Sequence, residues 1–309
     1  MRRSVILALT SLALVVALPA AAVELPTERV LKMDGNQWRP SANTTHLAFQ
    51  SNSRARPNRW NVWAMDLVTE ELEKVNAPGT NGYAGNLVPE TNSVIYQQVD
   101  GNSSDIYTYD IDTDTRTPVA EVNTGKWEWA PRMSETFLVF VRNERHAGHM
   151  KYVLRARELM TGTEQVLGRW RIDQAYSVEP GEVGDTYATW TVCYRTCEVF
   201  VRDLLERETA RVPAPRDRPQ YGVALDESVN ELYYIRSGFG CGLNVGIWTV
   251  PIDDPGATPE KLASLPSGVD ADTLATWHNP VSSQDDLLFA RVPCRATFGE
   301  DIWAVRGVS

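Results

Sequence analysis

The sequence predicts an all-β protein, a six-bladed β-propeller whose blades are four-stranded antiparallel sheets. Two observations indicate this fold. A short phrase in which apolar and polar residues alternate, such as IYTYDI at 106–111, returns six times along the chain. Its copies are spaced by about 40–50 residues, which is the length of a four-stranded blade. Few stretches carry the 3.6-residue period of an amphipathic helix, so we expect little α-helix.

The first predicted strand of each unit, strand a, passes through a proline or its substitute. These anchors are Pro40, Pro89, Pro131, Pro180, Leu225 and Pro280. About seven to ten residues later, an apolar stretch that ends in an aromatic ring predicts strand b. The rings are Phe49, Tyr96, Phe140, Trp190, Tyr234 and Phe289. A β-sandwich of this length would not repeat one pattern at the same place six times.

The repeated phrase itself predicts strand c, because alternation with period two gives a strand two unlike faces. Its copies are VWAMDL at 62–67, IYTYDI at 106–111, VLRAREL at 153–159, VFVRDL at 199–204, IWTVPI at 247–252 and IWAV at 302–305. A turn such as VTEE, DTDT or MTGT follows, and then a short strand d such as LEKVN or TARVP. Each unit is therefore predicted to contain four strands joined by turns.

No strand d follows the last copy, whereas an orphan strand stands near the N-terminus, within PTERVLKMDG at 26–35. Its Glu28-Arg29-Val30 resembles Glu73-Lys74-Val75, which lies at a strand-d position. We therefore expect residues 27–33 to pair with residues 301–306, so that the N-terminal strand completes the last blade and closes the ring. Closure would cover two strand edges that otherwise invite aggregation.

The repeat resembles the propeller repeats of the TolB family, which read roughly W-S-P-D-G, then I-A-F, then I-Y-V-M-D-L. The first unit is the best copy, with Trp38, Pro40, Leu47-Ala48-Phe49 and VWAMDL at 62–67. The Asp-Gly that follows the proline in the family is absent here. The resemblance implies a six-bladed propeller and a protein-binding role, without the α/β domain that precedes the propeller in TolB itself.

Residues 1–22 are expected to be a signal peptide, because two arginines precede an apolar run and an Ala-x-Ala cleavage site. The alternative is a retained N-terminal anchor. Residues 23–309 would then form a single propeller domain, secreted or periplasmic, without stable membrane insertion after cleavage, and we expect a monomer. The net charge is −10. Such an acidic chain argues against a nucleic-acid partner, which needs clustered Lys and Arg.

The four cysteines predict two disulfides, since an even count after a signal peptide is typical of exported proteins. Cys193 and Cys197 bracket a tight predicted hairpin between strands b and c. Cys241 and Cys294 lie in the equivalent loops of the fifth and sixth units, which makes a cross-blade bridge natural. Such bridges could hold the rim of blades four to six rigid for a ligand. Metal ligation is the rival interpretation, but no second close pair of cysteines is present.

Several side chains are candidates for ligand binding at the mouth of the channel. Aromatic and imidazole rings near the ends of the a strands could stack on a sugar or a peptide; these are Trp127, Trp129, Trp277 and His278. The long first b–c loop could add contacts to an anion through Arg54, Arg56 and Arg59. The competing interpretation is that large rings at repeating positions wedge between blades and contribute to the core.

The sequence gives little support for catalysis, a metal or a cofactor. It has no Gly-x-Ser-x-Gly elbow and no glycine-rich phosphate loop between a strand and a helix. His146 and His149 are three residues apart but lack a set of accompanying ligands. The acidic stretches DIDTDT and DGNSSD lack the glutamate that completes a calcium loop, so they are interpreted as turns. We expect no metal site and no cofactor.

The function predicted from these features is a non-catalytic module that binds a protein or another component of the cell envelope through its b–c loops. The alternative is a glycan-active hydrolase or lyase. General acid and base catalysis on a glycan needs two carboxylates facing one substrate. Glu128 and Glu179 belong to the a strands of adjacent units and could supply them. A sensor of a small molecule or a metal is the third possibility.

Overall fold

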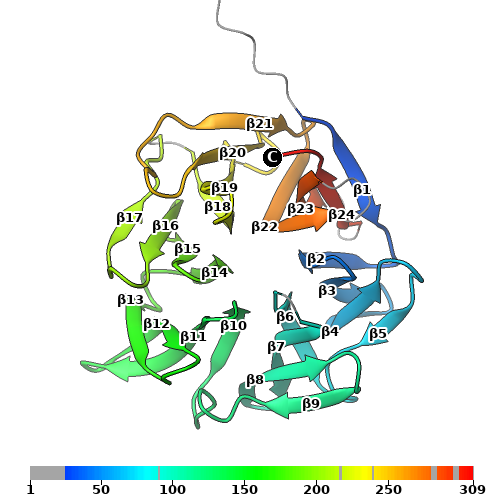
Figure 1. Ribbon diagram of the computed structural model, residues 1–309, viewed down its shortest axis with the longest axis vertical. Coiled ribbons are helices and arrows are strands. Elements are labelled where there is room, and N and C mark those ends of the chain that lie inside the picture. The colour runs from blue at the N-terminus through cyan, green and yellow to red at the C-terminus, as the bar shows by residue number, and fades with distance from the viewer. Residues whose placement is uncertain are drawn as a thin grey trace, which may run out of the picture.

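The computed structural model describes residues 25–308 apart from 90, 216–217, 239, 280–283 and 295–298. Within these residues, 24 strands form six four-stranded sheets. None of the described residues lies in a helix. The sheets stand around a central axis as the blades of a propeller (Figure 1). The predicted fold, an all-β six-bladed propeller, is confirmed.

Five blades use four consecutive strands, with strand a nearest the axis (Figure 1). Blade one contains β2 (Asn36–Ala42), β3 (His46–Ser53), β4 (Arg56–Asp66) and β5 (Leu72–Lys74), and blade two contains β6 (Asn81–Leu87), β7 (Ser93–Asp100), β8 (Ser103–Asp110) and β9 (Thr115–Pro118). Blade three contains β10 (Glu128–Met133), β11 (Phe137–His146), β12 (His149–Glu158) and β13 (Glu164–Arg171). Blade four contains β14 (Ser177–Val183), β15 (Tyr187–Cys193), β16 (Cys197–Asp203) and β17 (Thr209–Arg211), and blade five contains β18 (Gln220–Asp226), β19 (Glu231–Arg236), β20 (Gly246–Pro251) and β21 (Glu260–Ser264).

Blade six joins the two ends of the chain. It contains β22 (Val269–Asn279), β23 (Gln284–Pro293), β24 (Asp301–Val305) and, as its outer strand, β1 (Thr27–Leu31). β1 pairs antiparallel with β24, from Thr27 opposite Val305 to Leu31 opposite Ile302. The Arg306 guanidinium also donates to Glu28, at 3.1 Å. The predicted closure of the ring by the N-terminal strand is confirmed.

The core lies between neighbouring blades and not inside any one of them. Strand b is covered on both sides, and Leu47, Ala48 and Phe49 of β3 have no exposed surface. One cluster packs Ala48 of blade one against Tyr96 of blade two. Burying a large apolar side chain stabilises the fold by roughly 1.5–3 kcal/mol, so the interfaces between blades hold the ring together.

Every a strand is interrupted by a bulge at the same place. The pairing with strand b shifts between Trp38 and Ser41 in β2, and between the matching residues of the other five a strands. Five of the bulges hold one residue at positive φ, namely Arg39, Ala84, Ala130, Gly222 and Thr273. A bulge redirects side chains, so these segments determine which groups face the channel.

The bulges also correct the sequence alignment of the anchors. Pro40 and Pro131 lie within the bulges of their strands, and Pro180 is the last paired residue before the bulge of β14. Pro89, in contrast, lies beyond the end of β6, and Leu225 lies past the bulge of β18. The proline pattern located the a strands but misplaced these two copies by a few residues. Pro280 lies outside the described residues.

The hairpin tips confirm the interpretation of the acidic stretches as turns. Between β8 and β9, Asp110 Oδ1 accepts hydrogen bonds from the Thr113 backbone N–H and hydroxyl, both at 2.9 Å. His146 and His149 face each other at the exposed tip of the β11–β12 hairpin. No group of three or more His, Cys, Asp or Glu side chains suited to a metal ion occurs among the described residues.

The predicted signal peptide, residues 1–22, lies outside the described residues, as do the first two residues of the predicted mature chain. In the part of the chain that the structure describes, no helix is long and apolar enough to cross a membrane.

Candidate functional site

A cavity opens at each face of the propeller. On the face where the a–b turns open, a wide cavity of about 850 Å³ is lined by these turns from all six blades. On the opposite face, where the b–c and d–a loops open, a smaller cavity of about 280 Å³ lies on the side of blades three to six. We call the first the a–b cavity and the second the rim cavity. The rim cavity is lined among others by Arg132, Glu179, Cys193, Cys197, Gly222 and Asp272.

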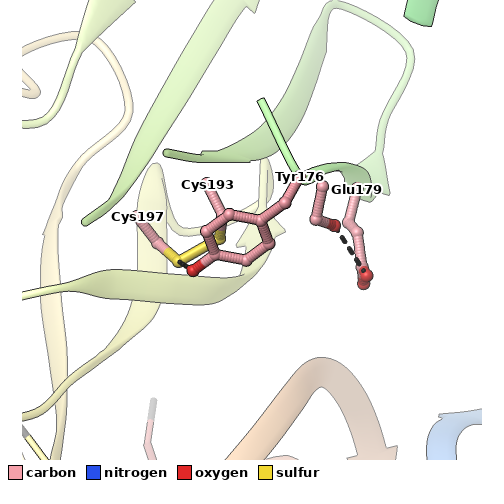
Figure 2. The surroundings of a disulfide bond; sticks show 5 residues. Tyr176, Glu179, Cys193 and Cys197 are labelled. Carbon is pink, nitrogen blue, oxygen red and sulfur yellow. Dashed lines mark hydrogen bonds between the residues drawn. A yellow bond between two sulfur atoms is a disulfide. The ribbon is translucent and has the colours of Figure 1, made fainter. Parts of the chain in front are cut away.

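A disulfide forms one wall of the rim cavity. Cys193 and Cys197 are opposite each other at the end of the β15–β16 hairpin and are bonded, with their Cα atoms 4.0 Å apart. Figure 2 shows the Tyr176 ring beside this disulfide, with its hydroxyl 3.8 Å from the Cys197 sulfur. The predicted clasp of this hairpin is confirmed, and it borders a cavity.

The second predicted disulfide is also formed. Cys241 and Cys294 are bonded across blades five and six, with Cα atoms 5.6 Å apart. The backbone around them is bonded as well, since the Cys294 N–H donates to Gly268 O at 3.0 Å. The rim of blades four to six is therefore cross-linked by disulfides at two places, as the cysteine positions predicted.

An ion pair crosses the channel beside the rim cavity. The Arg39 guanidinium of blade one donates to Glu179 Oε2 of blade four at 2.7 Å, and the two blades stand on opposite sides of the ring (Figure 1). The other Glu179 oxygen accepts from the Ser177 hydroxyl at 3.0 Å. Both side chains keep some solvent contact, so water screens the pair and limits its contribution to stability.

Arg132 contributes a second positive charge to the same place, and it is buried. Its exposed fraction is 8%. Its one hydrogen bond to a described residue goes to the carbonyl of its neighbour Pro131, at 3.2 Å. Burial and the nearby Arg39 lower the pKa of Arg132 to about 10, which leaves it charged at neutral pH.

Two further polar groups of the rim cavity come from β22. Asp272 Oδ1 accepts from the Thr273 backbone N–H at 2.9 Å. Burial, together with the negative charge of Glu179, raises the pKa of Asp272 to about 6. The Thr273 hydroxyl is buried without a hydrogen-bond partner among the described residues. Ionisable groups with shifted pKa values in a cavity are typical of functional sites.

The a–b cavity is acidic, but its most buried carboxylate is structural. Glu182 accepts from the Thr276 N–H at 2.8 Å, from the Thr276 hydroxyl at 3.0 Å and from the Leu225 N–H at 3.1 Å. Burial raises its pKa to about 7 although these bonds oppose the shift. Because the donors belong to blades five and six, Glu182 ties three blades together.

The exposed aromatic rings gather on the face of the rim cavity. Among the described residues, those counted as exposed are Trp127 at 43%, Tyr176 at 66% and Tyr194 at 37%. They lie in the β9–β10 connection, the β13–β14 connection and the β15–β16 turn, all of which open on this face. We call them the rim aromatics. Exposed Trp and Tyr side chains are enriched at protein interfaces.

The four rings that the sequence identified as binding candidates differ in their surroundings. Trp127 is exposed on the predicted face. Trp129 packs against Tyr152 and donates to Asn143 at 3.2 Å, so it belongs to blade three. Trp277 is 7% exposed and donates to the Asn43 carbonyl at 3.1 Å, which fixes it between blades six and one. The competing interpretation, rings wedged into the core, is correct for these two.

His278 and the three arginines do not line the rim cavity. His278 is exposed, pairs with Asp285 at 2.8 Å and lines the a–b cavity on the other face. Arg54 contacts Asp34 at 3.4 Å with 65% of its side chain exposed, and Arg56 is exposed at the tip of the β3–β4 hairpin. Arg59 lies further along β4 and lines neither cavity. Their predicted contact with an anion remains a prediction.

Glu128 does not face the channel cavities. It has no exposed surface and accepts from Arg142 at 2.8 Å and from Thr124 at 2.6 Å. Burial raises its pKa, although these two partners oppose the shift. The proposed pair of Glu128 and Glu179 across one substrate is therefore wrong, because the Glu128 carboxylate is buried and bonded to Arg142 and Thr124.

Sequence reasoning missed the charged residues that accompany Glu179. Arg39 and Arg132 each adjoin an anchor proline, in WRPS and APRM, and Glu179 adjoins a third in VEPG. A charge next to the anchor of an inner strand was the available signal. It could not be interpreted without the bulge, because alternation alone does not tell which side chains a bulge redirects.

No protein-family model and no curated protein matches the chain. Several solved structures share its fold. TolB from Acinetobacter baumannii superimposes with a TM-score of 0.55 at 12% identity, over 84% of this chain and 63% of that one. A putative TolB from Agrobacterium tumefaciens gives 0.57 at 11% identity, over 88% and 90%. An oligogalacturonate lyase in complex with manganese gives 0.55 at 14% identity, over 87% and 82%.

Such identities establish a common fold and nothing more about this chain. The chain spans less than two thirds of the length of the Acinetobacter TolB. The fold is thus that of the TolB-like six-bladed propellers, in agreement with the resemblance of the repeats.

Proposed function

We propose that this protein is an exported, non-catalytic propeller that binds a protein of the cell envelope through the face of the rim cavity. The observation that carries the proposal is the position of the rim aromatics. All three lie in loops on this face, and Tyr176 and Tyr194 lie at the Cys193–Cys197 disulfide.

Three further features support this role. The resemblance to TolB-like repeats implies protein binding. Two disulfides are typical of proteins that fold in an oxidising compartment such as the periplasm or the extracellular space. Rigid loops lose little conformational entropy when a partner binds, so the stapled rim suits tight recognition.

The test is affinity capture from the envelope fraction. Mature protein is immobilised, and the triple variant Trp127→Ala/Tyr176→Ala/Tyr194→Ala is compared with the wild type. We expect the wild type to enrich one protein and the variant to recover it at least about tenfold less, since interface aromatics each contribute about 2 kcal/mol or more.

A matched control variant removes exposed apolar side chains from the opposite face of the propeller. Met160 is 94% exposed in the β12–β13 turn and Leu205 is 62% exposed in the β16–β17 turn. The variant Met160→Ala/Leu205→Ala should capture the partner as the wild type does. Equal capture by the triple variant, or no capture by the wild type at several salt concentrations, would refute the proposal.

A glycan-active enzyme is the second candidate, favoured by the position of Asp272 in the rim cavity and by the fold shared with an oligogalacturonate lyase. A carboxyl group with a pKa of about 6 suits general acid or base catalysis. Incubation with acidic oligosaccharides should then release new reducing ends, and Asp272→Asn should abolish the release. If wild-type protein releases none, this candidate fails.

A further inference from the structure

Three arginines of the described chain are more than nine-tenths buried, and one of them differs from the other two. Arg142 donates to Glu128 at 2.8 Å and to the Val122 carbonyl at 2.6 Å. Arg236 donates to the Tyr234 hydroxyl at 2.9 Å and stacks on the Trp248 ring. Arg132 has one bond, to the adjacent Pro131 carbonyl. A buried charge is costly unless it is paired. Glu182 and Glu179 lie near enough to favour the charge of Arg132, but neither forms a hydrogen bond or an ion pair with it.

The unsatisfied donors of Arg132 lie on the wall of the rim cavity, together with other incomplete groups. Thr273 lines the same cavity, but its hydroxyl oxygen is buried and has no partner among the described residues. Asp272 accepts one backbone N–H on Oδ1, and its second oxygen is bonded to no described residue. The cavity therefore presents a guanidinium and a carboxylate that both have bonding capacity left.

Charges of both signs surround the cavity. Arg132, Glu179 and Asp272 line it, Arg39 pairs with Glu179, and the carboxylates of Glu182 and Glu300 lie near Arg132 and Asp272 respectively. A ligand that carries only a carboxylate would meet repulsion from the acidic side chains, and one that carries only an amine would leave the Arg132 donors unpaired. A ligand that carries both groups can place each beside the opposite charge.

Size limits the ligand further. A volume of about 280 Å³ would hold roughly nine water molecules at about 30 Å³ each. This suits a molecule of about six to ten non-hydrogen atoms and excludes a folded protein segment.

We infer that the rim cavity binds a small zwitterion, a free amino acid, with its carboxylate on Arg132 and its ammonium group on Asp272. The inference rests on the proposed function in taking this face as the binding face. The propeller thereby couples a small ligand to the surface that carries the rim aromatics.

The test is calorimetric titration of the mature protein at pH 7.5, after a thermal-shift screen of the twenty protein amino acids and D-alanine. For the best amino acid, three derivatives separate the two charges: its N-acetyl form, its methyl ester and a tripeptide that contains it. We expect the free amino acid to bind and each derivative to bind at least about tenfold more weakly. The N-acetyl form and the methyl ester each lose one charge, and the tripeptide holds its two charges too far apart to reach Arg132 and Asp272 together.

Variants assign the charges. Arg132→Gln should weaken binding of the free amino acid at least about tenfold. Asp272→Asn should weaken it similarly but should improve binding of the N-acetyl form, since the repelling carboxylate is gone. A misfolded variant could not bind the free amino acid more weakly and its N-acetyl form more tightly than the wild type does. Arg145→Gln, an exposed arginine of the same blade, should bind as the wild type does.

The inference is overturned if no amino acid binds the wild type, if the methyl ester or the tripeptide binds as tightly as the free amino acid, or if Arg132→Gln leaves affinity unchanged. These failures are separate from those of the proposed function. Loss of envelope capture in the rim-aromatic variant is measured without any amino acid, so either result can stand while the other falls.

Discussion

At the scale of single residues, the c–d turns hold some non-glycine residues in a left-handed backbone conformation that such residues disfavour. In blades one, three and four, the fifth residue of the turn has positive φ: it is Glu70, Gly162 and Arg207. In blades one and three its N–H donates to the first residue of the turn, from Glu70 to the Asp66 carbonyl at 3.0 Å and from Gly162 to the Glu158 carbonyl at 2.9 Å. Glycine adopts this conformation without strain, whereas other residues incur a cost in free energy.

Replacing Glu70 by glycine should therefore stabilise the protein. Glu70 is exposed, and relief of the left-handed conformation should raise the free energy of unfolding by about 0.5–1 kcal/mol. Denaturant unfolding measures the change. Glu71→Gly, one residue later and without positive φ, is the matched control and should destabilise the protein. A loss of stability in Glu70→Gly would contradict the argument.

The carboxyl group of Glu300 predicts a dependence of stability on pH. Burial, together with the charge of Asp272, raises the pKa of Glu300 to about 7, and its Oε2 atom has no partner among the described residues. A raised carboxyl pKa stabilises the fold fully below the unfolded pKa near 4.5, and this contribution is lost as the pH rises through about 7.

We therefore expect Glu300→Gln to be more stable than the wild type at pH 8, and the gain to shrink as the pH falls to 5. After allowance for solvent screening, the gain is on the order of 1–2 kcal/mol. Thermal unfolding across this pH range measures it. Glu135→Gln, on an exposed a–b turn, should leave the profile unchanged, and an equal gain at pH 5 and pH 8 would contradict the assignment.

Residue roles in the channel were the least predictable part of the molecule. The alternation of WAMDL or TYDI fixes which side chains of strand c face a neighbouring blade, so the core follows from sequence. In sequence, Trp277 and Glu128 fit the pattern expected of channel-facing residues. In the structure, Trp277 donates to Asn43 of the next blade, and Glu128 accepts from Arg142 of its own blade. These contacts join residues far apart in sequence, which a pattern within one strand does not contain.

At the scale of strands and hairpins, the two disulfides should differ in their effect. The Cys193–Cys197 bond closes a hairpin that its strand pairing already holds in register. The Cys241–Cys294 bond joins residues 53 apart in two blades. In the chain-entropy model a short loop of this kind stabilises the fold by about 2 kcal/mol and a loop of about 50 residues by about 4 kcal/mol.

The double variant Cys241→Ser/Cys294→Ser should thus lose about twice as much unfolding free energy as Cys193→Ser/Cys197→Ser. Denaturant unfolding under non-reducing conditions compares them, and the wild type with a reductant serves as a third sample. If the hairpin pair costs as much as the cross-blade pair, the loop lengths do not govern their stabilisation.

At the scale of the whole molecule, the ring depends on one short strand. β1 covers the edge of β24, and Val30 and Leu31 pack on the core between blades six and one. Each buried side chain contributes roughly 1.5–3 kcal/mol when fully buried, and an uncovered edge offers unpaired N–H and C=O groups to other chains.

A variant that begins at Lys32 should therefore lose about 3 kcal/mol or more of unfolding free energy and should self-associate through β24. Size-exclusion chromatography with light scattering, combined with thermal unfolding, measures both effects. A synthetic peptide of residues 25–33 should restore the monomer, because it can occupy the vacant edge. The same peptide with Val30→Asp and Leu31→Asp keeps the backbone donors but cannot pack on the core, so it should fail. A truncated protein that remains monomeric with unchanged stability would mean that the other blade interfaces hold the ring without its closing strand.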